Sequence, residues 1–248
     1  MRIEEKIVDI NYKDTKCFFN GRAKKYKKEN PYAVTMYQDN NALLVEQRNK
    51  DEQQKIMPLL QVNENSRIID IGCGIGRWSE AIKGEINSYW GIDFSEDLIK
   101  IARGRNYRQN IKFDVLSATD ILNHKYSDEI MPFNIIIISG VLLYLNDEDV
   151  KKVISAIDYI STKNAIIYIR EPVGIEHRLT LKEFFSEELD DYYNAIYRTK
   201  EEYENIFNQC LKPNKFKILK KKFLFDQNND LNNRVETSQF YFIITKFN

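Results

Sequence analysis

From residue 66 onward, short apolar runs alternate with amphipathic segments of helical period. One of them, residues 133–138, ends in four consecutive isoleucines, which is typical of a strand buried on both faces of a parallel sheet. The predicted strands are 68–71, 86–92, 111–115, 133–138 and 165–169. Strands that alternate with helices predict an α/β fold with a parallel sheet.

Two further apolar segments, 216–225 and 238–247, follow each other with only a polar, Asn/Asp-rich turn between them. Consecutive strands of this kind predict an antiparallel hairpin. Helix starts are predicted at Ser95, at Asn146 and at Thr199, where Glu202 completes a capping box. Together these signals predict a doubly wound, seven-stranded, mostly parallel sheet with a terminal antiparallel hairpin.

Two regions do not show the alternation of predicted strands and helices. Residues 1–65 are polar and aromatic, show no clear strand and contain an amphipathic stretch at 41–60, so they predict a helical cap or lid. Residues 172–198 fit no simple unit of one strand followed by one helix and are interpreted as an insertion. The predicted organisation is therefore a cap of residues 1–65 and a catalytic domain of residues 66–248.

Composition limits the functional classes. The 248 residues carry 37 basic and 37 acidic side chains, which disfavours broad electrostatic capture of nucleic acid. The longest apolar run, 133–145, is too short to cross a membrane, and the charged N-terminus shows no secretory signal. Three cysteines without close spacing and two histidines predict no metal site. A cytoplasmic protein is the simplest interpretation, and no sequence feature indicates an oligomeric state.

The segment with the clearest chemical meaning is Asp70-Ile71-Gly72-Cys73-Gly74-Ile75-Gly76. It lies between a predicted strand and a predicted helix, and its alternate glycines let the backbone turn sharply and approach a ligand. The next strand ends at Asp93, 17 residues after Gly76, near the interval at which such an acid meets ribose hydroxyls. The alternative is a glycine-rich turn that binds nothing.

The glycine spacing favours one cofactor over another. Dinucleotide-binding enzymes have G-x-G-x-x-G, whereas this chain has D-x-G-x-G-x-G. The segment resembles motif I of class I, Rossmann-like S-adenosylmethionine (SAM)-dependent methyltransferases. The resemblance implies that Asp70 and the backbone of Gly72, Cys73, Gly74 and Gly76 hold the amino-acid part of SAM. It also implies that Asp93 binds the ribose hydroxyls and that Phe94 flanks the adenine.

The resemblance extends over roughly residues 66–171. Residues 110–118 resemble the third-strand motif of the family, which places Ser117 and Ala118 near the adenine, although the family often has an acid where this chain has Ser117. Residues 133–142 resemble the fourth-strand motif, which assigns Ser139 to the cofactor site.

The N-terminal segment resembles the caps of methyltransferases that modify small molecules and sugars in polysaccharide gene clusters. By this analogy Tyr32 and Tyr37 lie against the sulfonium and Arg48 binds the methionine carboxylate; otherwise they pack an ordinary cap. The tyrosine-rich stretch 192–197 is either an acceptor wall or core.

Three residues are candidates for acceptor chemistry because they follow the carboxyl ends of the fourth and fifth strands: Tyr144, Glu171 and His177. A histidine or a carboxylate there suits a general base for a hydroxyl acceptor. Each is also compatible with a structural or surface role, and a loop histidine is more often simply exposed. His124, after the third strand, is expected to be structural or exposed.

The sequence therefore predicts a SAM-dependent methyltransferase for a small polar acceptor, such as a sugar, a nucleotide-linked sugar or a surface-polysaccharide precursor, with O-methylation favoured. Three alternatives remain: a methyltransferase that acts on RNA or protein, an NAD-dependent enzyme, and a SAM-binding module without catalysis.

Overall fold

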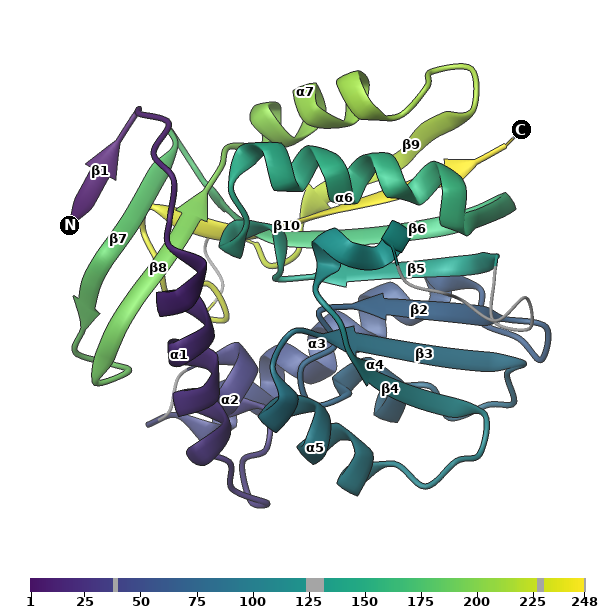
Figure 1. The fold of residues 1–248 in the computed structure, drawn as a ribbon, viewed down its shortest axis with the longest axis horizontal. Coiled ribbons are helices and arrows are strands. Elements are labelled where there is room, and N and C mark those ends of the chain that lie inside the picture. Colours follow the sequence, from purple (N-terminus) through teal and green to yellow (C-terminus); the bar gives the residue numbers. More distant parts are fainter. Residues whose placement is uncertain (38–39, 124–131, 227–229, 248) are drawn as a thin grey trace.

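A seven-stranded sheet forms the centre of the molecule (Figure 1). The computed structural model describes residues 1–37, 40–123, 132–226 and 230–247. The strand order is β4-β3-β2-β5-β6-β10-β9. The strands are β2 (Arg67–Ile71), β3 (Ser88–Asp93), β4 (Ile111–Val115), β5 (Phe133–Ser139), β6 (Ser161–Gly174), β9 (Phe216–Phe223) and β10 (Thr237–Lys246). The first five are parallel to one another, and β10 is antiparallel to both β6 and β9. This arrangement confirms the predicted sheet and its terminal hairpin.

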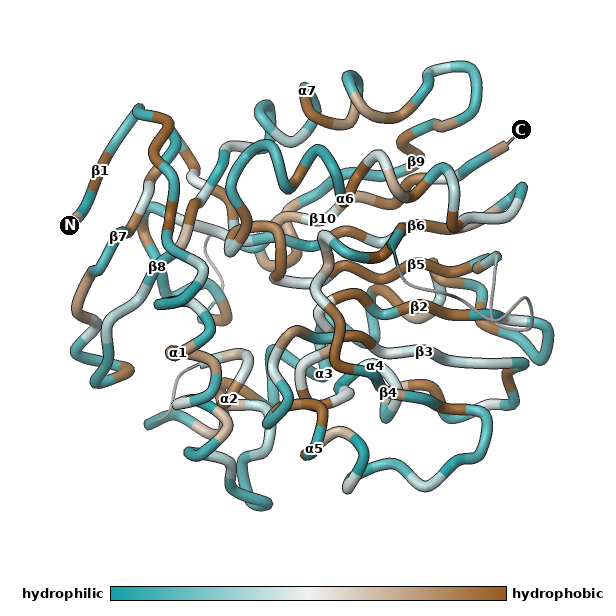
Figure 2. Tube along the Cα trace, in the orientation of Figure 1, coloured by the Kyte–Doolittle hydropathy of each residue, from teal (hydrophilic) through white to brown (hydrophobic). Residues whose placement is uncertain are grey.

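The central strands are apolar on both faces, as the hydropathy along β2 and β5 shows (Figure 2). Successive side chains of a strand point to opposite faces, so Ile68 packs in one buried cluster and Ile69 in the other. Ile136 and Ile137 are divided in the same way. The isoleucine runs that predicted doubly covered strands therefore fill two separate cores.

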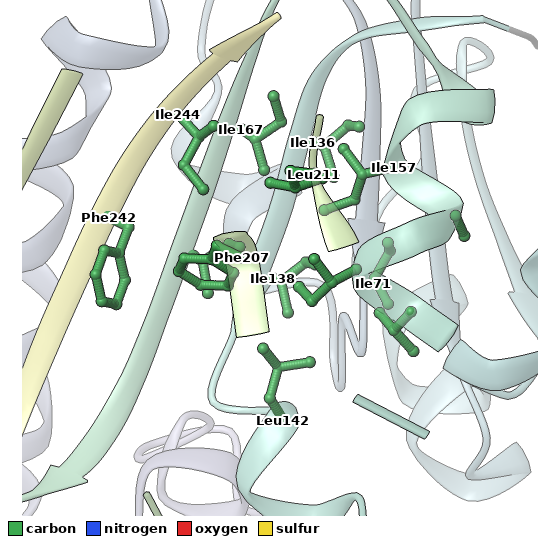
Figure 3. Packing of buried hydrophobic residues seen from close by; sticks show 14 of the residues in the cluster. Ile71, Ile136, Ile138, Leu142, Ile157, Ile167, Phe207, Leu211, Phe242 and Ile244 are labelled. Carbon is green, nitrogen blue, oxygen red and sulfur yellow. The ribbon is translucent and has the colours of Figure 1, made fainter. Parts of the chain in front are cut away.

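Helices cover both faces. On one face lie α6 (Asp147–Ile160) and α7 (Lys200–Cys210), and on the other α3 (Ala42–Leu60), α4 (Arg77–Ala81) and α5 (Glu96–Arg105). Figure 3 shows the first core, where Ile157 of α6 and Phe207 of α7 gather over Ile138 of β5. The capping box at Thr199 is present: its hydroxyl accepts from the Glu202 amide, and the Glu202 carboxylate accepts from the Thr199 amide.

The N-terminal segment differs from the prediction. It contains the helices α1 (Tyr12–Lys24) and α2 (Ala33–Met36), but it begins with the strand β1 (Arg2–Glu4). The insertion is a hairpin of β7 (Leu179–Ser186) and β8 (Asp191–Tyr197), and β1 completes it as a three-stranded sheet. A strand of three residues is too short to show a period of two, which is why the sequence did not reveal it. The expectation of a cap without strands was wrong.

A third apolar cluster holds these segments at the carboxyl ends of the central strands. Phe18 and Phe19 of α1 pack with Val34 of α2, with Tyr193 of β8 and with Leu143 of the single-turn helix η2 (Leu142–Tyr144). Helix α1 and the small sheet accordingly lie together at one end of the main sheet (Figure 1). The ends of the parallel strands, where ligands of open α/β sheets bind, are therefore covered.

Candidate cofactor and acceptor cavities

The turn after β2 requires glycine. Gly72 and Gly74 have φ angles of 72° and 55°, which are left-handed values that side chains disfavour. A Cβ atom on Gly72 would collide with the Val141 side chain, and one on Gly74 would lie 2.8 Å from the Cγ2 of Thr35. The backbone of the turn is thus brought close to η2 on one side and to α2 on the other, with no room for side chains between them.

Asp93 closes the turn from the next strand. Its carboxylate accepts hydrogen bonds from the Gly74 amide at 3.0 Å and from the Ser95 amide at 2.9 Å. Burial raises the pKa of Asp93 to about 6, although both amides favour the ionised form. The acid that the sequence identified at the end of β3 therefore lies directly against the glycine turn.

A first cavity of about 260 Å³ lies over these strand ends. Its floor contains the turn and strand-end residues Gly72, Gly74, Asp93, Phe94, Ser117, Ala118 and Ser139, all assigned to the cofactor from the sequence. Its roof comes from the N-terminal segment and includes Tyr12, Thr15, Lys16, Phe19 and Thr35. The sequence did not assign the roof residues, because no local motif marks them.

Other predicted cofactor residues lie behind the turn. Asp70 lies on the same face of β2 as Ile68, so it points away from the cavity and accepts the hydroxyl of Tyr89. Burial raises the pKa of Asp70 to about 7, despite that hydrogen bond and the charge of Arg77. Cys73 and Gly76 do not line the first cavity either. The direct contact of Asp70 with the cofactor stays a prediction, and in the structure its side chain does not line the first cavity.

A second cavity, of about 120 Å³, adjoins the first, and the two share Thr35, Gly140 and Tyr144. Tyr37 and Arg48, predicted to contact the cofactor, line this second cavity instead. The other lining residues are Met36, Glu52, Leu143, Arg170, Pro172, Tyr193, Tyr197, Leu224, Phe225, Arg234, Thr237 and Gln239. Tyr32 lines neither cavity, because its hydroxyl donates to Glu80.

A chain of tyrosine hydroxyls crosses the second cavity. The hydroxyls of Tyr37 and Tyr144 are hydrogen-bonded, Tyr144 meets Tyr193 at 3.2 Å, and Tyr193 meets Tyr197 at 3.1 Å. Burial raises the pKa values of Tyr144, Tyr193 and Tyr197, so all three remain neutral hydroxyls. Tyr144 joins the two cavities, and the tyrosine-rich stretch of β8 forms part of the second cavity's wall.

A buried carboxylate anchors α3 beneath this wall. Glu52 is 1% exposed and lies 2.8 Å from Arg77 and 3.2 Å from Arg170, and it accepts the hydroxyl of Tyr168 at 2.7 Å. Burial favours the neutral acid, but the charges of Arg170 and Arg77 outweigh it and hold the pKa of Glu52 at about 2. Two of the cavity's charged groups, Glu52 and Arg170, therefore balance each other.

Arg48 lacks such a partner. It is half-buried and donates to the Leu231 carbonyl at 2.8 Å and to the Asn233 side-chain oxygen at 2.6 Å, both neutral acceptors. Among the described residues no carboxylate forms an ion pair with it. Burial and the neighbouring charge of Arg234 lower the pKa of Arg48 to about 10. A negatively charged ligand in the second cavity would supply Arg48 with an ion pair that the described residues do not form.

Two predicted catalytic residues lie elsewhere. Glu171 is fully buried, and its carboxylate accepts from the backbone amides of Val141, Leu142 and Leu143 at 2.9, 3.0 and 3.2 Å. It follows Ile169 on the covered face of β6 and caps η2, and burial raises its pKa. His177 lies 3.8 Å from Glu4 of β1. Neither residue lines the first or the second cavity, so the geometry does not support their predicted roles at an acceptor, which stay predictions. His124 lies outside the described residues.

A family model for a methyltransferase domain matches residues 62–247. The chain belongs to this methyltransferase family. The match confirms the predicted class and its cofactor, SAM. The glycine turn and the acid at the end of β3, which the resemblance assigned to the cofactor, lie together at the first cavity. In the part of the chain that the structure describes, no group of His, Cys, Asp and Glu gathers as a metal site, and no helix is long and apolar enough to cross a membrane.

The similar curated proteins are phosphoethanolamine N-methyltransferases. The enzyme from Triticum aestivum is 27% identical over 49% of this chain and 24% of its own length, and the one from Plasmodium falciparum is 25% identical over 62% of this chain and 71% of its own. The chain spans only a quarter to a third of the plant relatives.

Solved structures share the fold. Phosphoethanolamine N-methyltransferase 1 of Haemonchus contortus, in complex with phosphoethanolamine and S-adenosylhomocysteine, has a TM-score of 0.69 at 16% identity, covering 96% of this chain and 50% of that one. The N-methyltransferase NodS of Bradyrhizobium japonicum has a TM-score of 0.57 at 12% identity, covering 92% of this chain and 98% of that one.

Proposed function

We propose that this methyltransferase methylates the amine of a small acceptor that also carries a negatively charged group. The acceptor occupies the second cavity, beside the cofactor in the first. The observation that carries this proposal is Arg48, a half-buried guanidinium that lines the second cavity and forms no ion pair with a carboxylate of the described residues. A partly desolvated guanidinium whose hydrogen-bond partners are neutral is suited to bind an anion such as a phosphate.

The position of the second cavity supports the proposal. Thr35, Gly140 and Tyr144 line both cavities, so a group at this shared wall is adjacent to a ligand of either one. SAM, when bound, supplies a methyl group already activated by the positive sulfur. What remains for the protein is mainly alignment and the exclusion of water. Phe19 and Thr35 cover the first cavity from the N-terminal segment, and the Tyr144 hydroxyl is placed to orient the acceptor.

An amine fits the available groups better than a hydroxyl. The O-methylation favoured by the sequence relied on a general base, but Glu171 is engaged by three backbone amides and His177 lies beside β1. Glu52 is held ionised by two arginines, and the buried tyrosines keep their protons. An amine needs only a free lone pair. The relatives named for N-methylation of phosphoethanolamine support the same choice.

The test is a methyl-transfer assay with labelled SAM. We expect transfer to phosphoethanolamine, and we expect Arg48→Gln to raise its KM at least tenfold while the Kd of S-adenosylhomocysteine stays within about twofold. Lys50→Gln, an exposed cation on the same helix, is the matched control. Transfer to a nucleotide-linked sugar but not to phosphoethanolamine would favour the sugar acceptor instead. An unchanged KM in Arg48→Gln would contradict the anion site.

A further inference from the structure

A third cavity of about 290 Å³ adjoins the second, between the β7–β8 hairpin and residues 234–237. Its polar lining includes Arg2, Ser186, Glu188 and Glu236. The apolar side chains that line it are Leu179, Leu181, Phe184, Leu189 and Val235. This cavity is more than twice as large as the second and is not needed to enclose a small amine.

The second and third cavities have a common wall. It is formed by Tyr37, Tyr193, Tyr197, Arg234 and Thr237, which line both. Arg234 forms an ion pair with Glu188 and is close enough to Arg48 to lower its pKa. Two guanidinium groups thus lie near the common wall, and one of them, Arg48, has no carboxylate partner among the described residues. A group with a single negative charge would complete the balance at this wall.

The shape of the site distinguishes two kinds of phosphate ester. The phosphate of a monoester such as phosphoethanolamine is terminal, so its site has no need of space beyond the guanidinium groups. A diester carries one negative charge and two ester arms. With its phosphate near Arg48 and Arg234, one arm would extend through the second cavity toward Tyr144 and the cofactor. The other arm would enter the third cavity, among Leu181 and its apolar neighbours.

We infer that the acceptor is a phosphodiester of an amino alcohol, whose second ester substituent is compact, partly apolar and bound in the third cavity. The inference rests on the proposed function, in which the amine receives the methyl group from SAM. The ammonium group of the acceptor first releases a proton to solvent, which frees the nitrogen lone pair. The nitrogen then forms the new bond to the methyl carbon, while the carbon–sulfur bond breaks with its electron pair remaining on sulfur.

The first experiment compares two probes, phosphoethanolamine and glycerophosphoethanolamine, in the SAM-dependent assay with the full chain. We expect kcat/KM for the diester to exceed that for the monoester at least tenfold. If kcat/KM for the diester is equal to or lower than that for the monoester, the inference is wrong but the proposed function still holds. The third cavity would then not bind part of the acceptor. If neither probe is methylated, the proposed function fails together with the inference.

The second experiment fills the third cavity. Leu181→Trp should lower the diester-to-monoester ratio of kcat/KM at least fivefold, because the added ring occupies the space of the ester substituent. Leu219→Trp, at an exposed position of β9, is the control and should leave that ratio unchanged. Ser186→Trp, at the partly exposed rim of the cavity, makes the same test if Leu181→Trp does not fold. An unchanged ratio in a folded cavity variant overturns the inference.

Discussion

The hydroxyl of Tyr37, from the N-terminal segment, is hydrogen-bonded to the hydroxyl of Tyr144, which follows the fourth parallel strand at the boundary of the first and second cavities. The two side chains come from positions 107 residues apart. This contact links the N-terminal segment to the boundary between the proposed cofactor and acceptor cavities, so its loss should affect acceptor binding more than cofactor binding.

Removing either hydroxyl tests this link. Tyr37→Phe and Tyr144→Phe should each raise the acceptor KM about three- to tenfold, and the double variant should cost little more than one single change. The reason is that each hydroxyl loses its partner when the other is removed, a coupling of about 1 kcal/mol. The acceptor KM of the wild type, the two single variants and the double variant is measured by steady-state kinetics at saturating SAM. The exposed Tyr192→Phe serves as control. If the changes in acceptor KM of the two single variants simply add up in the double variant, the hydrogen bond between the two hydroxyls does not contribute to acceptor binding.

Asp93 should determine cofactor affinity. Asp93→Ala is expected to weaken the binding of S-adenosylhomocysteine more than tenfold, about 1.4 kcal/mol, because the carboxylate lies against the glycine turn and is placed to accept ribose hydroxyls. Calorimetry measures the Kd, and Glu96→Ala, an exposed acid on the following helix, serves as control. Wild-type affinity in Asp93→Ala, or binding of NAD in place of SAM, would refute the assignment of the first cavity.

Glu171 should matter for folding rather than for proton transfer. Glu171→Gln replaces an acceptor of three amide protons by a group that itself carries donors, and we expect a loss of about 2–4 kcal/mol in the free energy of unfolding. Urea unfolding measures this loss, and the pH profile of kcat should keep its shape. Full stability combined with a hundredfold lower kcat would restore Glu171 as a catalytic candidate.

Asp70 gives the stability a defined pH dependence. Its pKa is about 7 in the folded protein against about 3.9 in an unfolded chain, so between pH 4 and 7 the folded state binds more protons. The free energy of unfolding therefore falls as the pH rises through this window. The pKa of Asp93, raised by burial to about 6, makes the free energy of unfolding fall in the same direction.

Asp70→Asn should remove the part of that decline due to Asp70. We expect the loss of stability between pH 5 and pH 7.5 to be smaller than in the wild type by about 1 kcal/mol or more, which corresponds to roughly 2–4 °C in Tm for a chain of this size. Thermal unfolding at the two pH values is the measurement, with the exposed Glu64→Gln as control. An identical decline in Asp70→Asn would mean that Asp70 is ionised throughout this range.

The sequence predicted those features that are encoded locally. Strand–turn–helix order, the glycine spacing and an acid at the next strand end are all read within about 25 residues, and the residues that they single out, Gly72, Gly74 and Asp93, line one cavity. The same motif assigned Asp70 to the cofactor, but alternation along β2 places its side chain on the face of Ile68, and it does not line the first cavity. The alternation of side chains along β2 could be predicted from the sequence. The sequence did not indicate which helices cover each face of the sheet.

The acceptor side could not be predicted from local patterns. Arg48, Tyr144 and Tyr193 meet through tertiary packing between segments that share no spacing rule. Glu171 and His177 satisfied the rule that active groups follow strand ends, yet one caps η2 and the other lies beside β1. Proximity in sequence to a strand end does not determine whether a side chain points into a cavity, since loop conformation decides it.

The pairing of β1 with β7 also has a consequence for synthesis of the chain. Arg2 pairs with Leu181, so β1 finds its partner strand only after the long segment between them has been synthesised. During that interval Phe18 and Phe19 of α1 lack the β8 surface that buries them. The late closure of so long a loop makes the small sheet a slow step in folding. The nascent N-terminal segment is then a natural target for a chaperone that holds exposed aromatic side chains.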